Sequence, residues 1–266
     1  MIKRIIVSLI ILPALTVLIL MENPYPFVAV GILSLSIALF ELYSMLGKKK
    51  IKTFRIIGFI FSLVCYSFLV FRFDFSYYFY TYAAMIIVLF CAVIVSKNAD
   101  NFPTVFFTAG PVIYLTALGS FGLELKMMEN GSYWLFILLL MTWVYDGGAY
   151  FVGSAIGKHK LIPELSPGKT IEGCVGGVII NVITAVIIKL TFLKSFGLVS
   201  VYDMAILAVL ISISGQAGDI SASIIKRYTG VKNSSNILPG HGGLMDKIDS
   251  AIFNAPVLYL YIKLVL

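Results

Sequence analysis

The chain has 266 residues, of which 60% are hydrophobic and only 12% are charged, and its mean hydropathy is +0.99. Soluble domains are about half apolar and about a quarter charged, so this composition excludes an ordinary soluble protein and predicts an integral membrane protein. The pI near 9.2 also suits a nucleic-acid-binding protein, but in a membrane protein a basic excess more often reflects positively charged cytoplasmic loops.

The first apolar run follows two basic residues and extends from Ile5 to Met21. It is longer than the apolar core of a typical signal peptide, and no small-residue cleavage site follows it, so we interpret it as a retained span. A transmembrane helix needs about 20 apolar residues, and in lipid the backbone must be paired internally, which favours helices for runs of this length. Nine spans are predicted, approximately Ile5–Met21, Phe27–Leu46, Phe54–Phe71, Tyr77–Val95, Phe102–Phe121, Ser132–Val152, Gly173–Phe192, Tyr202–Ile225 and Ala251–Leu264.

Basic residues are unevenly distributed over the loops between these spans. With loops alternating between the two sides, fifteen Lys and Arg residues fall on the side of the N-terminus and four on the other. Because positive residues gather on the cytoplasmic side, the N-terminus is predicted to be cytoplasmic and the C-terminus outside. The sequence therefore predicts an all-α integral membrane protein with about nine transmembrane helices in the cytoplasmic (inner) membrane. The same asymmetry explains the basic pI without a nucleic-acid partner.

The two longest polar loops, 157–170 and 226–249, both lie in the second half of the chain and on the predicted cytoplasmic side. We therefore divide the chain into an N-terminal transmembrane region, 1–130, with about five helices, and a catalytic transmembrane region, 131–266, with about four. No internal repeat is recognisable, which weighs against a transporter because many transporters have two similar halves.

Two aspartates lie inside predicted spans, where ionisable residues are costly and usually functional. Asp146 lies towards the cytoplasmic end of the sixth span, and Asp219 precedes Lys226 by seven residues, or about 10 Å along a helix. Gly215, Asp219, Ser223 and Lys226 would follow one helix face, which indicates a water-accessible groove open to the cytoplasm. A seam of small residues is the alternative for Gly215 and Ser223, and a structural pair with a neighbouring lysine is the alternative for each aspartate.

The segment LPGHGGLMDKID, 238–249, is unusually polar for this chain. Asp246 and Asp249 are three residues apart and would share one face of a helix. Gly242 and Gly243 permit the close approach of backbone amides to a ligand, as in phosphate-binding loops. His241 is interpreted as a metal ligand, a phosphate contact or an ordinary loop residue.

Three carboxylates, those of Asp219, Asp246 and Asp249, are expected to converge at the cytoplasmic edge. Carboxylate ligands without cysteines favour a hard cation such as Mg²⁺. We expect one or two divalent cations, and a monovalent ion is left open. Basic residues that can hold phosphate oxygens flank the carboxylates in the sequence: Lys226, Arg227, Lys232 and Lys247. Acidic ligands surrounded by cations are what a nucleotide–metal site requires.

The loop segment SPGKTIEG, 166–173, precedes the seventh predicted span. Ser166 is expected to be the N-cap, and Lys169 and Glu172 are three residues apart. By itself the segment is best interpreted as a capped and charge-paired helix start. Beside a nucleotide site, Lys169 becomes a candidate phosphate ligand.

The segment SIIKRYTGVKNSSNILPGHGGLMDKID, 223–249, resembles the signature of the phosphatidate cytidylyltransferase (CDP-diacylglycerol synthase) family. That signature runs Ser-x-apolar-Lys-Arg, Lys-Asp, Pro-x-His-Gly-Gly and Asp-Arg-apolar-Asp at the same spacings. The stretch 143–173 is similar to a second region of the family, whereas the first 130 or so residues match only in being spans. Asn233 stands where the family usually has Asp, Lys247 where it has Arg, and Gly168 where a basic residue is frequent. Lys247 keeps the charge but lacks the planar fork of arginine, which implies a looser phosphate geometry.

The resemblance implies a reaction between CTP and phosphatidic acid in the membrane. The lipid phosphate attacks the α-phosphorus of CTP, which gives CDP-diacylglycerol and pyrophosphate. The catalytic residues that it implies are Asp219, Asp246, Asp249, Lys226, Arg227 and Lys169, and the three aspartates are assigned to Mg²⁺. Substrate contacts are assigned to Asp146, Ser166, Glu172, Ser223, Lys232, His241, Gly242, Gly243 and Lys247. The active site faces the cytoplasm, and a homodimer is left open.

Two other functions remain as alternatives. A CTP-dependent polyprenol or lipid-alcohol kinase would transfer the γ-phosphate to a neutral hydroxyl and would need a base beside it, and the near-complete signature argues against it. An ion-coupled transporter would use Asp146 and Asp219 as charge relays. Its polar residues would be expected near the bilayer midplane, whereas here they gather at the cytoplasmic edge.

Overall fold

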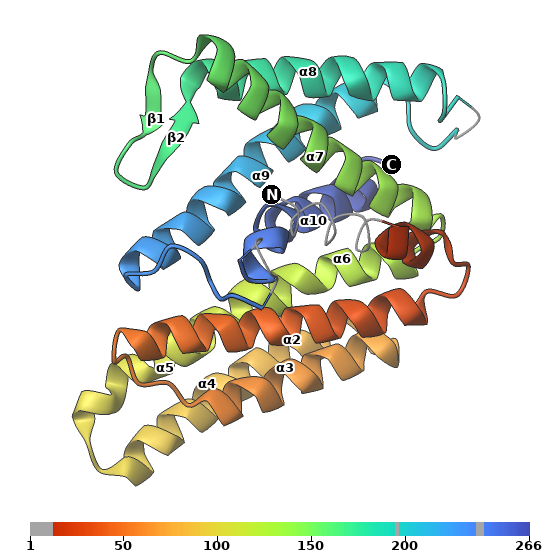
Figure 1. Ribbon diagram of the computed structural model, residues 1–266. Helices are drawn as coiled ribbons and strands as arrows, with labels where there is room; N and C mark the ends of the chain where they lie inside the picture. The colour runs from red at the N-terminus through yellow and green to blue at the C-terminus, as the bar shows by residue number, and fades with distance from the viewer. Residues whose placement is uncertain (1–12, 195–196, 238–241) are drawn as a thin grey trace. The chain divides into compact units, whose positions relative to one another are not determined.

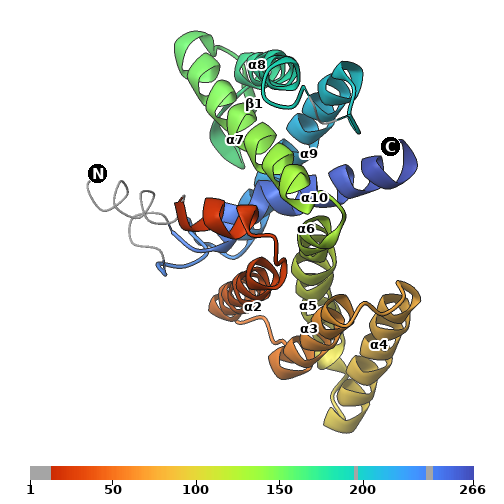
Figure 2. The same ribbon diagram turned by 90° about the vertical axis from the view of Figure 1, so that its right-hand side faces the viewer.

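The computed structural model describes residues 13–194, 197–237 and 242–266 (Figures 1 and 2). The described chain divides into two units. Unit 1 comprises the chain up to Ser132 together with Ile225–Ile248, and unit 2 comprises Tyr133–Ile224 together with Asp249–Leu266. Two helices, α9 (Val201–Tyr228) and α10 (Met245–Leu264), pass from one unit into the other.

Unit 1 is built from helices that follow one another closely in the sequence. After a helical stretch at 13–20, its elements are α2 (Tyr25–Lys48), α3 (Arg55–Val70), α4 (Ser76–Ser96), the 3₁₀ turn η1 (Ala99–Asn101), α5 (Phe102–Pro111), the π turn η2 (Val112–Ala117) and α6 (Leu118–Met127). Helix α2 packs against α3, α5 and α6, and α3 packs against α4 (Figure 1). Pro111 has no N–H to donate to the preceding turn, which accounts for the irregular helical geometry that follows it.

Two apolar clusters form the interior of unit 1. The first joins α2, α3 and α6 through buried side chains that include Leu35, Tyr66 and Leu123. The second joins α4 and α5 through Met85, Leu89 and Val105. The helices are therefore held by packing of apolar faces, as their composition predicts.

Unit 2 contains α7 (Gly131–Ile156) from Tyr133 onward, strands β1 (Lys160–Ile162) and β2 (Ser166–Thr170), and α8 (Ile171–Leu190), with most of α9 and α10. Small residues allow its helices to approach closely. A Cβ added at Gly176 of α8 would lie 2.5 Å from Val152 of α7. Asn254 of α10 donates to Thr142 of α7 at 2.8 Å, and Asn181 of α8 donates to Ser212 of α9 at 2.9 Å. Buried polar bonds thus link helices that otherwise present apolar surfaces.

The antiparallel hairpin β1–β2 is a local exception to the predicted all-α fold. It also corrects the predicted start of the next helix, because Ser166 lies on β2 and is not an N-cap. Thr170 caps α8 instead, and its hydroxyl accepts from the amide of Gly173 at 3.1 Å.

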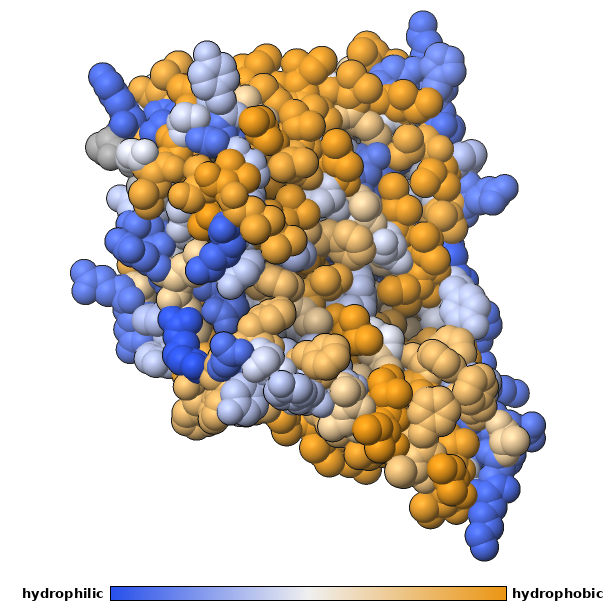
Figure 3. Space-filling model, turned by 180° about the vertical axis from the view of Figure 1, so that it is seen from behind, coloured by the Kyte–Doolittle hydropathy of each residue, from blue (hydrophilic) through white to orange (hydrophobic). Residues whose placement is uncertain are grey.

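Six helical segments of the described residues are long and apolar enough to span a membrane: Tyr25–Lys48, Ser76–Ser96, Ala99–Met127, Gly131–Ile156, Ile171–Leu190 and Val201–Tyr228. Helix α3 is also apolar but shorter, with 16 residues. The first part of the predicted span Ile5–Met21, residues 5–12, lies outside the described residues, and 13–20 is helical. Apolar side chains cover much of the face shown in Figure 3. The protein is therefore a predominantly helical integral membrane protein.

Candidate functional site

Helices α9 and α10 carry the aspartates and basic residues on which the predicted site depends. Asp219 and Lys226 both lie on α9, and Asp246 and Asp249 lie in the first two turns of α10. The helical spacing predicted for both pairs is confirmed. In addition, α9 and α10 approach closely at Gly215, where a Cβ would lie 2.8 Å from the side chain of Asn254, and the seam of small residues stays an alternative for Gly215 and Ser223.

In unit 1 the central feature is an ion pair between Lys226 and Asp246. Lys226 Nζ lies 2.7 Å from Asp246 Oδ1, and the two side chains are only 14% and 12% exposed. The second oxygen, Oδ2, accepts from Ser234 N at 2.9 Å and from Gly243 N at 3.1 Å, and it lies 3.0 Å from Ser234 Oγ, whose single proton is donated to Glu41. Burial by itself would raise the pKa of Asp246, but these bonds and the charge of Lys226 outweigh it and hold the pKa below its usual range. A carboxylate in this setting is ionised at neutral pH.

A second carboxylate, Glu41 of α2, lies beside this pair in unit 1. It accepts from the hydroxyl of Ser234 and from the amide of Met245. The sequence analysis did not select Glu41 because it stands in an apolar stretch far from the signature. The signal was nevertheless present, since an ionisable residue inside a predicted span indicates a functional position.

Gly242 and Gly243 lie so close to these two carboxylates that a larger residue would not fit at either position. Gly242 has a φ of +86°, which favours glycine, and a Cβ there would lie 2.8 Å from Asp246 Oδ2. A Cβ at Gly243 would lie 2.6 Å from both oxygens of Glu41 and would overlap Ser234 Oγ. The amide of Gly243 already donates to Asp246. Contact of these amides with a nucleotide stays a prediction, and His241, predicted beside them, lies outside the described residues.

We expect Gly243→Ala to destabilise the protein by about 1–3 kcal/mol, the usual cost of forcing an extra carbon into a packed site. The new methyl group would displace Ser234 or Glu41. Gly110→Ala in α5 is the matched control, because a Cβ there has no neighbour within 4 Å. Thermal unfolding in detergent should therefore show a lower Tm for Gly243→Ala and little change for Gly110→Ala. Equal Tm values for the two variants would contradict the close packing around Gly243.

In unit 2 a second ion pair joins strand β2 to α9. Lys169 Nζ lies 2.7 Å from Asp219 Oδ2, with side chains 21% and 35% exposed. Asp146 of α7 interacts electrostatically with both residues. In the same unit the hydroxyl of Tyr145 bonds to Gln216 Oε1. Three of the predicted site residues are thus brought together in unit 2.

The hairpin that carries Lys169 is anchored by Glu172. Its carboxylate accepts from the amide of Lys158 at 3.1 Å and lies 2.5 Å from Nδ1 of His159. The charge pairing expected between Lys169 and Glu172 is therefore replaced by two separate pairs, Lys169 with Asp219 and Glu172 with His159. Glu172 thus holds residues 158 and 159, which lie just before β1. A role for Glu172 in substrate binding remains a prediction.

Asp249 occupies a different environment from Asp246. It is buried within unit 2, and its Oδ1 accepts from the amide of Ser250 at 2.8 Å. A Cβ at Gly218 would overlap the backbone oxygen of Asp249, so α9 and α10 cross closely at this point.

The carboxylates suit a hard cation by their chemistry. Asp219 and Asp246 are each already paired with a cationic group, since a lysine Nζ lies 2.7 Å from one carboxylate oxygen. Among the residues that the structure describes, no group of three or more His, Cys, Asp or Glu is arranged to hold a metal. Carboxylate oxygens are nevertheless the type of ligand that Mg²⁺ prefers, and the convergence of the three aspartates on a cation stays a prediction.

The remaining predicted residues lie mainly on the surface. Arg227, Lys232 and Lys247 are exposed, and Ser223 is half-buried on α9. Asn233, one of the departures from the signature, lies beside the loop, with its Cβ 3.5 Å from a Cβ added at Gly242.

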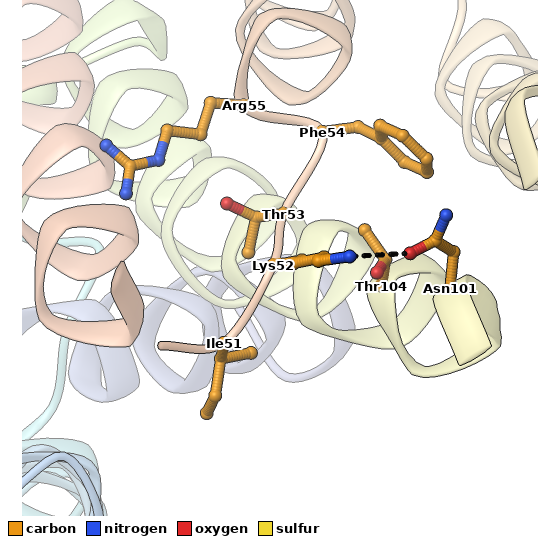
Figure 4. Close-up of a pocket in the computed structure, with 7 residues that line it drawn as sticks. All are labelled: Ile51, Lys52, Thr53, Phe54, Arg55, Asn101 and Thr104. Carbon is orange, nitrogen blue, oxygen red and sulfur yellow. Dashed lines mark hydrogen bonds between the residues drawn. The ribbon is translucent and has the colours of Figure 1, made fainter. Parts of the chain in front are cut away.

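A cavity of about 390 Å³ lies elsewhere in unit 1. Figure 4 shows its lining, in which Lys52 Nζ bonds to Asn101 Oδ1 at 3.4 Å. Its other lining residues are Ile51, Thr53, Phe54, Arg55 and Thr104. None of the predicted site residues lines this cavity, so it is separate from the two ion pairs.

Comparisons with known proteins agree with the resemblance of the signature segment. The model of the cytidylyltransferase family matches residues 2–265. A phosphatidate cytidylyltransferase of Bacillus subtilis is 36% identical, and the alignment covers 86% of each chain. Proteins of the same name from Staphylococcus haemolyticus and Staphylococcus aureus are 38% and 35% identical, over 66% of this chain and 65% of theirs. The chain therefore belongs to the cytidylyltransferase family.

Proposed function

We propose that the protein is a phosphatidate cytidylyltransferase, which transfers CMP from CTP to phosphatidic acid. The substrates follow from the names of its relatives. The observation that carries the proposal is the Lys226–Asp246 ion pair, which lies inside the signature segment and whose carboxylate accepts from the amide of Gly243. Such a pair places negative charge for a cation beside positive charge for phosphate oxygens, with Lys226 in the last turn of α9 and Asp246 in the first turn of α10.

In the proposed reaction, an oxygen of the lipid phosphate forms a bond to the α-phosphorus of CTP. The bond between that phosphorus and the oxygen bridging to the β-phosphate breaks, and pyrophosphate leaves with the bonding electrons. The attacking phosphate is already an anion, so no strong general base is needed. Catalysis then depends on positioning and on charge neutralisation.

Three cationic side chains, Lys169, Lys226 and Arg227, take phosphate oxygens in this proposal. Asp219, Asp246 and Asp249 are the residues that would hold Mg²⁺, which neutralises phosphate charge when bound. The ion pairs at Asp219 and Asp246 support this assignment, because each lysine would be released to phosphate when its carboxylate takes a cation. Asp146 would help to orient Lys169, with which it interacts electrostatically.

We further propose the membrane arrangement that the basic loops predict. The chain would cross the inner membrane about nine times, with the N-terminus in the cytoplasm and with residues 131–266 as the catalytic region. The two ion pairs would lie near the cytoplasmic surface. CTP would then arrive from the cytoplasm and phosphatidic acid from the bilayer.

Two labelled forms of CTP test this function. Purified protein is incubated with phosphatidic acid, a polyprenol and Mg²⁺, and label is counted in the lipid fraction after reaction with CTP labelled at the α- or at the γ-phosphate. Transfer of the α-label is the expected result. Transfer of the γ-label alone would identify a lipid kinase. A folded sample that transferred neither label would contradict both enzyme functions and favour the ion-coupled transporter.

A further inference from the structure

Glu41 is a buried acidic side chain that the proposed reaction does not use. It lies on the membrane helix α2 and is 1% exposed. A carboxylate at such a position is costly unless hydrogen-bond donors replace water. Its environment therefore needs a physical explanation.

Four donors from a single segment of unit 1 surround this carboxylate. Oε1 accepts from Ser235 Oγ at 2.5 Å and from the amide of Leu244 at 3.0 Å. Oε2 accepts from Ser234 Oγ at 3.0 Å and from the amide of Met245 at 2.9 Å. A carboxylate offers about four lone-pair positions, so Glu41 is saturated by the protein and is not available to bind a metal or a substrate.

Two of these donors belong to the start of α10. The first amides of a helix have no partner within the helix, and a negative charge near them is stabilising. Glu41 supplies both the acceptors and the charge to Leu244 and Met245, immediately before Asp246. It thus acts as an N-cap contributed by a helix about 200 residues earlier in the chain.

The same contacts reach Asp246 through Ser234. The Ser234 hydroxyl lies 3.0 Å from Glu41 Oε2 and 3.0 Å from Asp246 Oδ2, and its amide also donates to Asp246. Asp246 in turn binds Lys226. Movement of Glu41 would therefore shift the first turn of α10 and one wall of the Asp246 site together.

We propose that Glu41 is a positioning residue that fixes the first turn of α10 so that Asp246 and Lys226 are held in register for CMP transfer. This inference rests on the proposed function. It assigns a role in the reaction to the N-terminal region, where the sequence carries no catalytic motif.

Glu41→Gln is the most informative variant, because it keeps the size of the side chain. Each oxygen of Glu41 accepts from one hydroxyl and one backbone amide. A hydroxyl can rotate to accept a bond, but an N–H cannot, so the glutamine loses one cap bond in either orientation. We expect kcat per folded molecule to fall by about 10- to 100-fold, the range found when residues supporting a metal ligand are lost. The Mg²⁺ concentration for half-maximal activity should rise, and hydrogen exchange at Leu244 and Met245 should accelerate.

Lys126→Met is the matched control for general destabilisation. Lys126 is another buried charge of unit 1, 4% exposed, and its Nζ donates to the backbone oxygens of Ile19 and Met21 at 2.6 and 2.8 Å. Its Nζ also donates to Ser132 Oγ at 2.8 Å, and none of these three partners lies in 226–249. We expect a lower Tm for Lys126→Met, with kcat and Mg²⁺ dependence per folded molecule unchanged. Glu41→Asp, which retains the charge, should recover part of the activity lost in Glu41→Gln.

Two results would overturn the positioning role. One is a Glu41→Gln enzyme with wild-type kcat and Mg²⁺ dependence per folded molecule. The other is unchanged hydrogen exchange at Leu244 and Met245 in that variant. Wild-type protein that transferred no CMP would instead refute the proposed function, so the two failures are distinguishable.

Discussion

Replacing Asp246 with asparagine is expected to lower the rate of CMP transfer by about 100- to 1,000-fold, as the loss of one preorganised electrostatic contact does in other enzymes. The substitution leaves the shape of the side chain nearly unchanged but removes the charge that Lys226 contacts at 2.7 Å. It also turns one acceptor into a donor beside the amides of Ser234 and Gly243. Initial rates with CTP and phosphatidic acid, normalised to folded protein, measure the effect.

The pH dependence of stability gives this prediction a second measurement. Because the folded pKa of Asp246 is lowered, its contribution to stability is present above the unfolded value of about 4 and is lost as pH falls through the folded pKa. Asp246→Asn should remove that part of the acid dependence. It should also lower stability at neutral pH, since Lys226 loses its partner.

Asp203→Asn is the control for this variant. Asp203 lies near the start of α9, where its carboxylate accepts from Tyr261 at 2.7 Å and from the amide of Ser200 at 2.8 Å. It is 16 residues from Asp219, or about 24 Å along the helix. Wild-type rates are expected for Asp203→Asn. If Asp246→Asn kept more than about a tenth of the activity, Asp246 would be a structural residue and its role in catalysis would be rejected.

Local patterns in the sequence predict most of the helical fold, because long apolar runs leave few alternatives to membrane helices. The helical placement of Asp219, Lys226, Asp246 and Asp249 follows from short spacings in the same way. The hairpin was not predicted. Its second strand, SPGKT, lacks the alternation that indicates a strand and has a single β-branched residue, Thr170. Its position depends on contacts such as that between Glu172 and His159.

The contacts of the site join residues that are far apart in the chain. The sequence alone did not predict these long-range pairs. Asp219 was expected to pair with a neighbouring lysine or to bind a cation, and its partner in the structure is Lys169, 50 residues away. Glu41 contacts Met245 across an even longer separation. The glycines of the polar loop were attributed to ligand approach alone, whereas Gly243 is also required by the side chains of Glu41 and Ser234. A single sequence therefore identifies polar residues that are unusual in an apolar chain, but it does not show which of them are in contact in the folded protein.

The ion pair between Lys169 and Asp219 leads to the second large expected effect. Asp219→Asn and Lys169→Met should each lower kcat/KM by about 100- to 1,000-fold, because one removes a carboxylate assigned to the cation and the other a charge assigned to phosphate. The two residues touch, so their effects should not add, and the double variant should be only slightly slower than the slower single variant. Initial rates over a range of CTP concentrations for the four proteins give the coupling.

Lys160→Met separates this ion pair from the general effect of positive charge on the hairpin. Lys160 lies on β1, where it pairs in register with Thr170, and it is exposed. Its loss removes the same charge from the same hairpin without touching Asp219, so near wild-type activity is expected. If Lys160→Met and Lys169→Met were equally impaired, the hairpin would act only by attracting anionic substrates, and such a loss would be relieved by salt, which screens exposed charges. A loss confined to Lys169→Met and insensitive to salt would instead place the effect at the contact with Asp219.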